Sequence, residues 1–187
     1  MTYTRAIDPG KRAGIADADG FTVVGVRVFE DNPPPEMQAW IQKNRPVLYV
    51  HGRGSIVGRG NALITRAIDF GRQVQRKFAE RPTTSIDHVV AEKPLLTHAR
   101  PVNAAADVVT RGNDLIVTAI RLGRLIEASR PVRLTLVTPG QWKGQVPKDI
   151  HNRRVLAKLT PAEATLASNL DHNGIDALGL LLWALER

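Results

Sequence analysis

The sequence predicts an α/β protein built on a mixed five-stranded sheet with helices on both faces. Three strand-like segments follow one another near the start, and two more then alternate with amphipathic helical segments. Short turns between the first three favour an antiparallel meander. Strands separated by helices are joined by crossovers, which makes them parallel and places helices over the sheet.

Residue composition defines the strands. The segment FTVVGVRVF at 21–29 is rich in β-branched and aromatic residues, which favour strands. Asp19-Gly20 before it is a strong two-residue hairpin signal, so Asp17 and Asp19 are interpreted as hairpin residues. The strands of the sheet are expected at 2–8, 13–17, 21–29, 86–92 and 132–138, with an additional short strand at 46–50.

Apolar residues at intervals of three and four define the helices. The clearest stripe predicts a helix at about 62–79 that Asn61 is positioned to cap, and a second amphipathic helix at 113–128 begins with Asn113 as its cap. The sequence TPAE at 160–163 is a capping box with proline at the first helical position. Further helices are expected at 36–44, 149–159 and 173–186, and a basic loop at 139–148.

The chain has 187 residues, the length of one ordinary domain, and 43% of them are hydrophobic. We expect a single domain over 1–187 with an insertion at about 31–60, where three consecutive prolines and a glycine- and arginine-rich stretch interrupt the pattern. No apolar run approaches the roughly 20 residues that span a bilayer. The charged first residues do not resemble a signal peptide, and cysteine is absent. These features predict a cytoplasmic protein that does not enter a membrane.

Basic residues outnumber acidic ones. Lys and Arg number 26 against 18 Asp and Glu, which gives a net charge of +8 and a pI near 10.4. A surplus of this size favours polyanionic partners, nucleic acid first and an acidic membrane surface second. A basic surface that only keeps the protein soluble is the alternative.

Three carboxylates stand at unusual positions. Asp8 and Glu92 each end an expected strand just ahead of a proline, and Asp176 lies on an otherwise apolar final helix. Each has an ordinary explanation as a turn, a solvated strand end or a local cap. Together they suit hard cations, because clustered carboxylates without Cys ligands favour Mg²⁺ or Mn²⁺. Two such ions can activate water for phosphodiester hydrolysis.

Four motifs in the same order resemble the RuvC-type Holliday junction resolvases of the RNase H-like superfamily. They are AIDPGKRAGIA, HVVAEKP, TPGQWKGQVPKD and HNGIDALGLLLWAL, the last in the form seen among phage-type members. The resemblance implies an RNase H-like sheet, a Mg²⁺- or Mn²⁺-dependent endodeoxyribonuclease with two ions per active site, a four-way DNA junction as substrate and a homodimer. It also implies a bacterial or phage-infected cell as the setting.

The resemblance assigns metal binding and catalysis to Asp8, Glu92 and Asp176. The family has an Asp or His three residues before the last acid, and this chain has Asn173 there. Helical spacing makes His172 or Asn173 the better candidate for this fourth position, and Asp171 reaches the site only if the helix begins after it.

Basic residues are expected to contact DNA. Lys143 matches a basic position in the family's loop and Lys148 another, with roles in stabilising charge on the phosphate. Arg53 and Arg59, in a glycine-rich setting, are candidates for the DNA backbone or belong to a solvated loop. Trp142 stacks on a base or, as we favour, anchors the loop.

The sequence leaves several functions open. A resolvase is the leading hypothesis, and its dimer interface is expected on the apolar face of the 62–79 or the 113–128 helix. A nuclease for flaps, forks or RNA–DNA hybrids would use the same acids. A non-catalytic nucleic-acid-binding module and a sugar-kinase-like ATPase are weaker alternatives, because all three acids are present and the chain is short for an ATPase of that kind.

Overall fold

The computed structural model describes residues 2–10, 12–30, 35–44, 55–78, 85–95 and 104–187, with the backbone alone at 55–59, 78 and 104–113. The chain forms two compact units. The first unit holds all five strands and helices α4 to α7, and the second holds α1 to α3. The expectation of a single domain with an insertion stays a prediction.

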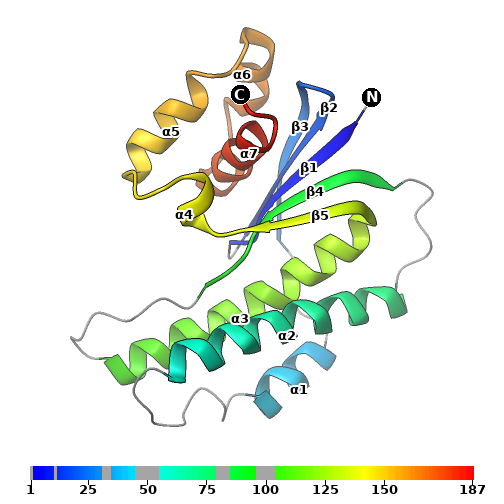
Figure 1. Ribbon diagram of the computed structural model, residues 1–187, viewed down its shortest axis with the longest axis vertical. Helices are drawn as coiled ribbons and strands as arrows, with labels where there is room; N and C mark the ends of the chain where they lie inside the picture. The colour runs from blue at the N-terminus through cyan, green and yellow to red at the C-terminus, as the bar shows by residue number, and fades with distance from the viewer. Residues whose placement is uncertain (1, 11, 31–34, 45–54, 79–84, 96–103) are drawn as a thin grey trace. The chain divides into compact units, whose positions relative to one another are not determined.

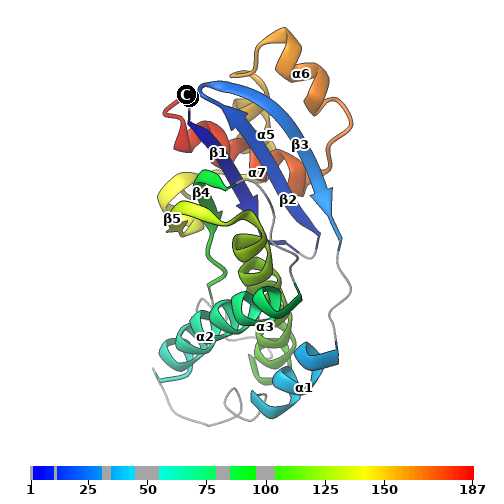
Figure 2. The same ribbon diagram turned by 90° about the vertical axis from the view of Figure 1, so that its right-hand side faces the viewer.

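The five strands form one mixed sheet in the order β3-β2-β1-β4-β5. β1, β2 and β3 pair antiparallel, whereas β4 pairs parallel with β1 and β5 pairs parallel with β4 (Figures 1 and 2). The expected mixed five-stranded sheet is therefore confirmed. The strands are β1 Tyr3–Asp8, β2 Ala13–Asp19, β3 Thr22–Phe29, β4 Ile86–Glu92 and β5 Pro131–Val137.

The hairpin between β2 and β3 turns at Gly20, which has a φ of +58°. Such a left-handed conformation favours glycine, so the predicted turn is confirmed. Asp17, however, is no hairpin residue. It is buried in β2 between Arg5 at 2.6 Å and Arg27 at 2.8 Å, because a buried carboxylate is stable only when it is paired.

One face of the sheet is covered by α7, which contacts β1, β2 and β3 (Figure 1). Helices over that face were expected. The contact buries small strand residues against large helix residues, with Ala6, Ala16 and Val90 opposite Leu178 and Leu181 in one hydrophobic core. The helices of this unit are α4 Pro139–Trp142, α5 Lys148–Leu156, α6 Pro161–Ala167 and α7 His172–Ala184.

The backbone of α7 lies directly on the β1–β2 hairpin. A Cβ atom added at Gly14 would lie 2.0 Å from the main-chain oxygen of Asn173, and one at Gly10 would lie 2.7 Å from its Oδ1 atom. Such distances are impossible for a real side chain, so glycine is required at Gly14. Because Gly14 pairs with Asp8 in the sheet, this contact brings the start of α7 to the end of β1.

The second unit consists of α1 Pro35–Asn44, α2 Ser55–Phe78 and α3 Ala104–Ser129. α2 and α3 pack closely where Gly71 meets the carbonyl of Ile120 and Gly123 meets that of Ile68. These contacts involve the apolar faces that were expected to form a dimer interface, so the faces pack on each other inside one chain. None of the described helices is both long enough and apolar enough to cross a membrane.

Two expected helix starts are wrong. α2 begins six residues before Asn61, and α3 begins well before Asn113, so neither asparagine is a cap. Cap signals are local, whereas helix stability in proteins comes mainly from tertiary packing, which tolerates glycine and asparagine inside a helix. The expected basic loop at 139–148 contains the short helix α4, and the expected strand at 46–50 lies outside the described residues.

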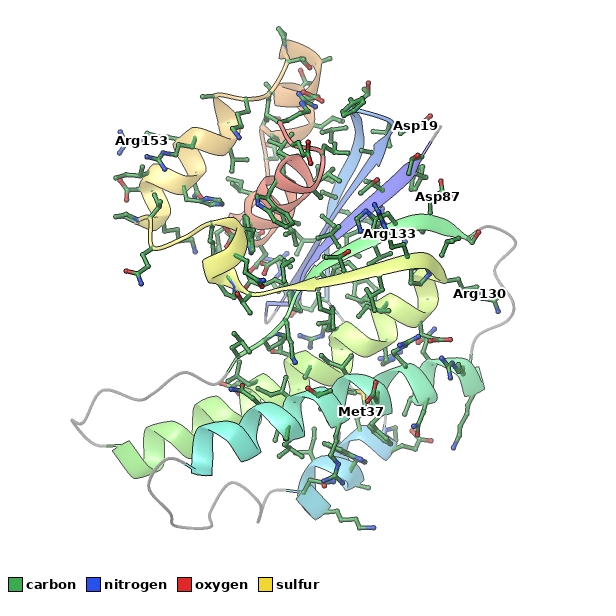
Figure 3. The ribbon with its side chains drawn as sticks, in the orientation of Figure 1. Asp19, Met37, Asp87, Arg130, Arg133 and Arg153 are labelled. Carbon is green, nitrogen blue, oxygen red and sulfur yellow. The ribbon has the colours of Figure 1, made fainter. Side chains whose placement is uncertain are left out.

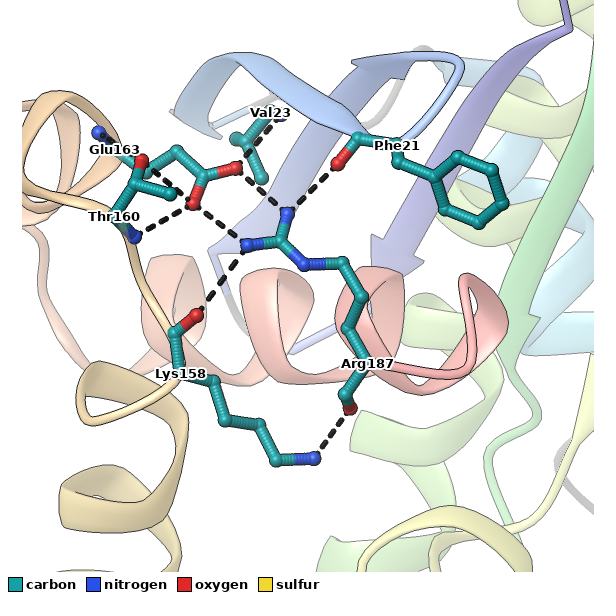
Figure 4. Close-up of polar contacts among 6 residues, drawn as sticks. All are labelled: Phe21, Val23, Lys158, Thr160, Glu163 and Arg187. Carbon is teal, nitrogen blue, oxygen red and sulfur yellow. Dashed lines mark hydrogen bonds and ion pairs between the residues drawn. The ribbon is translucent and has the colours of Figure 1, made fainter.

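A buried carboxylate joins α6 to the rest of the first unit. Glu163 accepts hydrogen bonds from the guanidinium of Arg187, from the backbone N–H groups of Thr160 and Val23, and from the Thr160 hydroxyl (Figure 4). The capping box predicted at Thr160 is therefore confirmed. These bonds, led by the one from Arg187, hold the pKa of Glu163 well below its usual range even though burial opposes them.

This network predicts a pH dependence of stability. Because the pKa of Glu163 is lower in the folded than in the unfolded chain, its ionised form stabilises the fold above about pH 4.5 and that contribution is lost on acidification. We expect Glu163→Gln to lower the free energy of unfolding at pH 7 by about 1–3 kcal/mol and to flatten its decline below pH 4.5. Urea unfolding from pH 3 to 7 measures both, with the exposed Glu36→Gln as control. Parallel curves for wild type and Glu163→Gln would contradict this role.

Candidate active site

Asp8 and Glu92 end neighbouring parallel strands at the same edge of the sheet. Ile7 pairs with Ala91, so the two acids follow directly on from that pair. Both side chains lie on the face of the sheet that carries Ala6 and Val90, because alternate residues of a strand point the same way, and that face packs against α7. The parallel pairing inferred from the sequence therefore brings these two carboxylates together.

Helix α7 adds the third carboxylate. The Nζ atom of Lys143 lies 3.6 Å from Oδ2 of Asp176 and 3.4 Å from Oε2 of Glu92, so one ammonium contacts both acids. Burial lowers the pKa of Lys143, but the charges of Glu92, Asp176 and Asp8 outweigh burial and leave that pKa above its ordinary value. Lys143 is therefore a firmly charged cation among the three acids.

Asp8 is the least compensated of the three acids. Its side chain is almost fully buried, with 6% of its surface exposed. Burial first, and then the negative charges of Glu92 and Asp176, raise the pKa of Asp8 to about 8, although Lys143 and Lys148 act in the opposite direction. A carboxylate buried beside two others favours any additional positive charge that can reach it.

Of the three candidates for the fourth position, Asn173 is the buried one. Its side-chain oxygen lies against Gly10, next to the end of β1. Asp171 caps α7 by accepting hydrogen bonds from the N–H groups of Asn173 and Gly174, and it also pairs with Arg12 at 3.2 Å. His172 is exposed in the first turn of α7. Asn173 is thus the candidate best placed beside the acids.

Of the three other residues predicted to bind DNA, the structure describes the side chain of Lys148 but not those of Arg53 and Arg59. Lys148 is the exposed first residue of α5, and its charge reaches Asp8. Arg53 lies outside the described residues, and Arg59 belongs to α2 at a point where only the backbone is described. The DNA-binding roles of these two arginines stay predictions.

Two contacts with the acids were not predicted from the sequence, one made by Trp142 and one by His151. The indole N–H of Trp142 donates a hydrogen bond of 2.7 Å to Glu92, so this buried tryptophan anchors the loop, as favoured, and also orients an acid. His151 on α5 places its Nε2 atom 3.5 Å from Oδ1 of Asp176 and its ring edge-on to Trp142. The only signal for His151 was its spacing of four from the apolar Val155, which puts both on the buried face of α5.

The surroundings of His151 favour the neutral form of its imidazole. Burial chiefly lowers its pKa, and Lys143 and Arg154 lower it further, against the opposing effect of Asp176. Its Nε2 atom is buried and has no hydrogen-bond partner among the described residues. His151 therefore restricts where the Asp176 carboxylate can lie because its ring packs against that carboxylate, and not because it forms an ion pair with it.

The donor groups fit a hard divalent cation in type and charge. Three carboxylates and the amide oxygen of Asn173 are oxygen ligands of the kind that Mg²⁺ and Mn²⁺ prefer, and the Lys143 ammonium shows that a cation is accommodated between two of the acids. The described residues contain no group of three or more Asp, Glu, His or Cys already spaced as a metal site. The acids would therefore have to draw closer around an ion.

Comparison with known proteins gives a distant structural likeness. No family model and no curated protein matches the chain. RuvC of Thermus thermophilus in complex with Holliday junction substrate is similar at 14% identity and a TM-score of 0.40, over 99% of this chain and 94% of that one. Another structure of Thermus thermophilus RuvC is similar at 19% identity and a TM-score of 0.36, over 98% and 94%. Likenesses this distant carry no argument about activity.

The crowding of acids around Asp8 has a measurable cost. Because the pKa of Asp8 is raised from 3.8 to about 8 by folding, the stability that its protonated form provides is lost as the pH rises through that interval. In EDTA at pH 7 we expect Asp8→Asn to raise the free energy of unfolding by about 1–3 kcal/mol.

Urea unfolding in EDTA provides the measurement, with Asp19→Asn as the exposed control (Figure 3). Added Mg²⁺ should stabilise the wild-type protein and leave Asp8→Asn unchanged. A destabilised Asp8→Asn protein would show that the three acids do not repel one another.

Proposed function

We propose that this protein is a metal-dependent endonuclease that hydrolyses phosphodiester bonds in branched DNA, as a Holliday junction resolvase. The observation that carries the proposal is the convergence of Asp8, Glu92 and Asp176 around Lys143 at one edge of the sheet. The surplus of eight positive charges supports a nucleic acid partner. The four ordered motifs that resemble RuvC-type resolvases support branched DNA as the substrate.

In this proposal Asp8, Glu92, Asp176 and Asn173 hold Mg²⁺ or Mn²⁺. Two bound ions would supply an activated water and stabilise the leaving oxygen. Trp142 donates a hydrogen bond to Glu92 and His151 contacts Asp176, so the two residues keep these acids in place. Such support matters because ligand groups must be held in position before the substrate arrives.

The two lysines act on the DNA. Lys143 is charged, partly exposed and in contact with two of the acids, which is where a phosphate must lie to be cut. Its ammonium stabilises the negative charge that develops on the phosphate. Lys148 is exposed close enough to influence Asp8, and it contacts a neighbouring phosphate of the same strand.

The cost of burying Asp8 argues against a non-catalytic binding module. Asp8 lies among like charges, whereas a module that only binds DNA gains nothing from a carboxylate with a pKa near 8. A nuclease for flaps, forks or RNA–DNA hybrids would use the same residues and stays the second candidate. We further propose a homodimer, because symmetrical cuts in a four-way junction need two active sites.

The decisive experiment is cleavage of a synthetic four-way junction in Mg²⁺ or Mn²⁺, beside a flap and an RNA–DNA hybrid of the same sequence. Wild type should cut the junction at paired symmetrical positions and the other two substrates more slowly. Asp8→Asn and Asp176→Asn should bind the junction and lower the cutting rate at least about 100-fold, because even residues that only support a metal ligand typically cost about 10–100-fold when replaced. An intact junction at every wild-type concentration would refute the resolvase, and faster hybrid cutting would favour the second candidate.

The hydrogen bond from Trp142 to Glu92 gives a separate prediction. Trp142→Phe keeps an aromatic ring in the core but removes the N–H donor. We expect junction cutting to slow by about tenfold, since residues that orient a metal ligand typically matter at that level. Trp40→Phe, which alters only the stacked ring pair with Phe70 in the other unit, is the matched control. Equal rates for the two variants would show that Glu92 needs no support from Trp142.

A further inference from the structure

A pocket of about 390 Å³ lies beside the candidate active site. It is lined by residues of the α4 segment, of α5 and of the end of α7, all within the first unit, and α5 and α7 lie in contact (Figure 1). Trp142, Lys143 and His151 belong to its wall, and these residues also contact Glu92 or Asp176. A DNA strand bound at the three acids would therefore lie next to this pocket.

The pocket is cationic. Lys143, Arg154, Lys158 and Arg187 line it against a single acid, Glu186. The guanidinium of Arg187 is occupied by Glu163 and by the carbonyl of Phe21, and the Lys158 amine donates to the main-chain oxygen of Arg187 (Figure 4).

Arg154 differs from these neighbours. It is exposed, and no hydrogen bond or ion pair joins it to another residue of the described chain. Its charge nevertheless reaches the imidazole of His151, so it lies close to the active site. A guanidinium with free donors is suited to a phosphate group.

The pocket also offers an aromatic surface. Trp183 lines it and keeps 39% of its surface exposed, although the six residues before it on α7 are buried. Val146, Val155 and Leu182 add apolar wall. An exposed indole beside a free guanidinium is the combination with which proteins hold single-stranded nucleic acid, the ring stacking on a base and the cation meeting the backbone. The volume is at the lower end of small-molecule sites and takes one nucleotide rather than a duplex.

We infer that this pocket binds an unpaired nucleotide of the DNA strand next to the cut phosphate, with its base on Trp183 and its phosphate on Arg154. The inference rests on the proposed nuclease function and extends it. Such a pocket would make the enzyme prefer DNA in which a nucleotide beside the cleavage position can unstack from its neighbours. The crossover of a branched junction is such a place. Fully paired DNA must first unstack a base, which costs free energy.

The test uses the full chain and a four-way junction carrying 2-aminopurine at positions next to the mapped cut, with Ca²⁺ to allow binding without cutting. At one of these positions the 2-aminopurine fluorescence should change when the junction binds to the wild-type protein. The same position should show no change when the junction binds to Trp183→Leu. We expect about tenfold weaker binding for Trp183→Leu. Arg154→Ala should bind more weakly and lower the slope of log Kd against log salt by about one.

Arg153→Ala is the matched control. Arg153 neighbours Arg154 on α5 but points outward, pairs with Asp149 at 2.9 Å and does not line the pocket (Figure 3). Its replacement should change Kd by less than about twofold, as for a solvated surface pair. Thermal unfolding checks that Trp183→Leu is folded, and Arg154→Ala removes only an exposed side chain.

The outcomes separate this inference from the function on which it rests. A wild-type protein that neither binds nor cuts the junction would overturn the proposed function. A protein that cuts normally while Arg154→Ala and Trp183→Leu both behave as Arg153→Ala would overturn the pocket assignment alone. The pocket assignment would also be overturned if the fluorescence of no 2-aminopurine position depended on Trp183.

Discussion

The close contact between α7 and the β1–β2 hairpin is the constraint on which the candidate site depends. The main chain of Asn173 lies so near Gly14 that no side chain fits between them. Gly14 is also the sheet partner of Asp8. Since α7 carries Asp176, the absence of one side chain on β2 decides how closely the helix acid approaches the strand acids. The small residues Ala6 and Ala16 permit the same approach along the rest of the contact.

Two buried aspartates on neighbouring strands differ in how their burial is compensated. Asp17 is 3% exposed and lies between two arginines, so its burial is compensated within the fold. Asp8 is 6% exposed and faces two other carboxylates, while Lys143 divides its contacts between those two. The negative charge of Asp8 is thus not balanced by a cation of its own, and a buried acid of this kind favours the binding of a positive ion.

The positions of the strands were predicted more accurately from the sequence than the starts of the helices. Strand segments depend on local composition, and β4 has the bounds that were expected. The starts of α2 and α3 were misplaced because Asn61 and Asn113 look like caps, whereas packing between helices extends both helices past them.

The same distinction holds for the site. The motif acids were found because two of them end strands ahead of a proline and the third lies on an apolar helix. Trp142 and His151 were not recognised as their partners, because a contact between side chains from α4, α5 and α7 depends on packing that no short motif records. The parallel pairing of β4 with β1 and of β5 with β4, by contrast, followed from the alternation of strands with helices.

The position of α7 in the chain has a consequence for biosynthesis. Asp8 and Glu92 are made early, but the helix that carries Asp176 follows all five strands and packs on the first two. A chain still on the ribosome therefore has a sheet without the helix that packs over Asp8 and Glu92, and domains fold as units once their parts are available. In the proposed nuclease the third acid therefore joins the other two only after the last helix has been made.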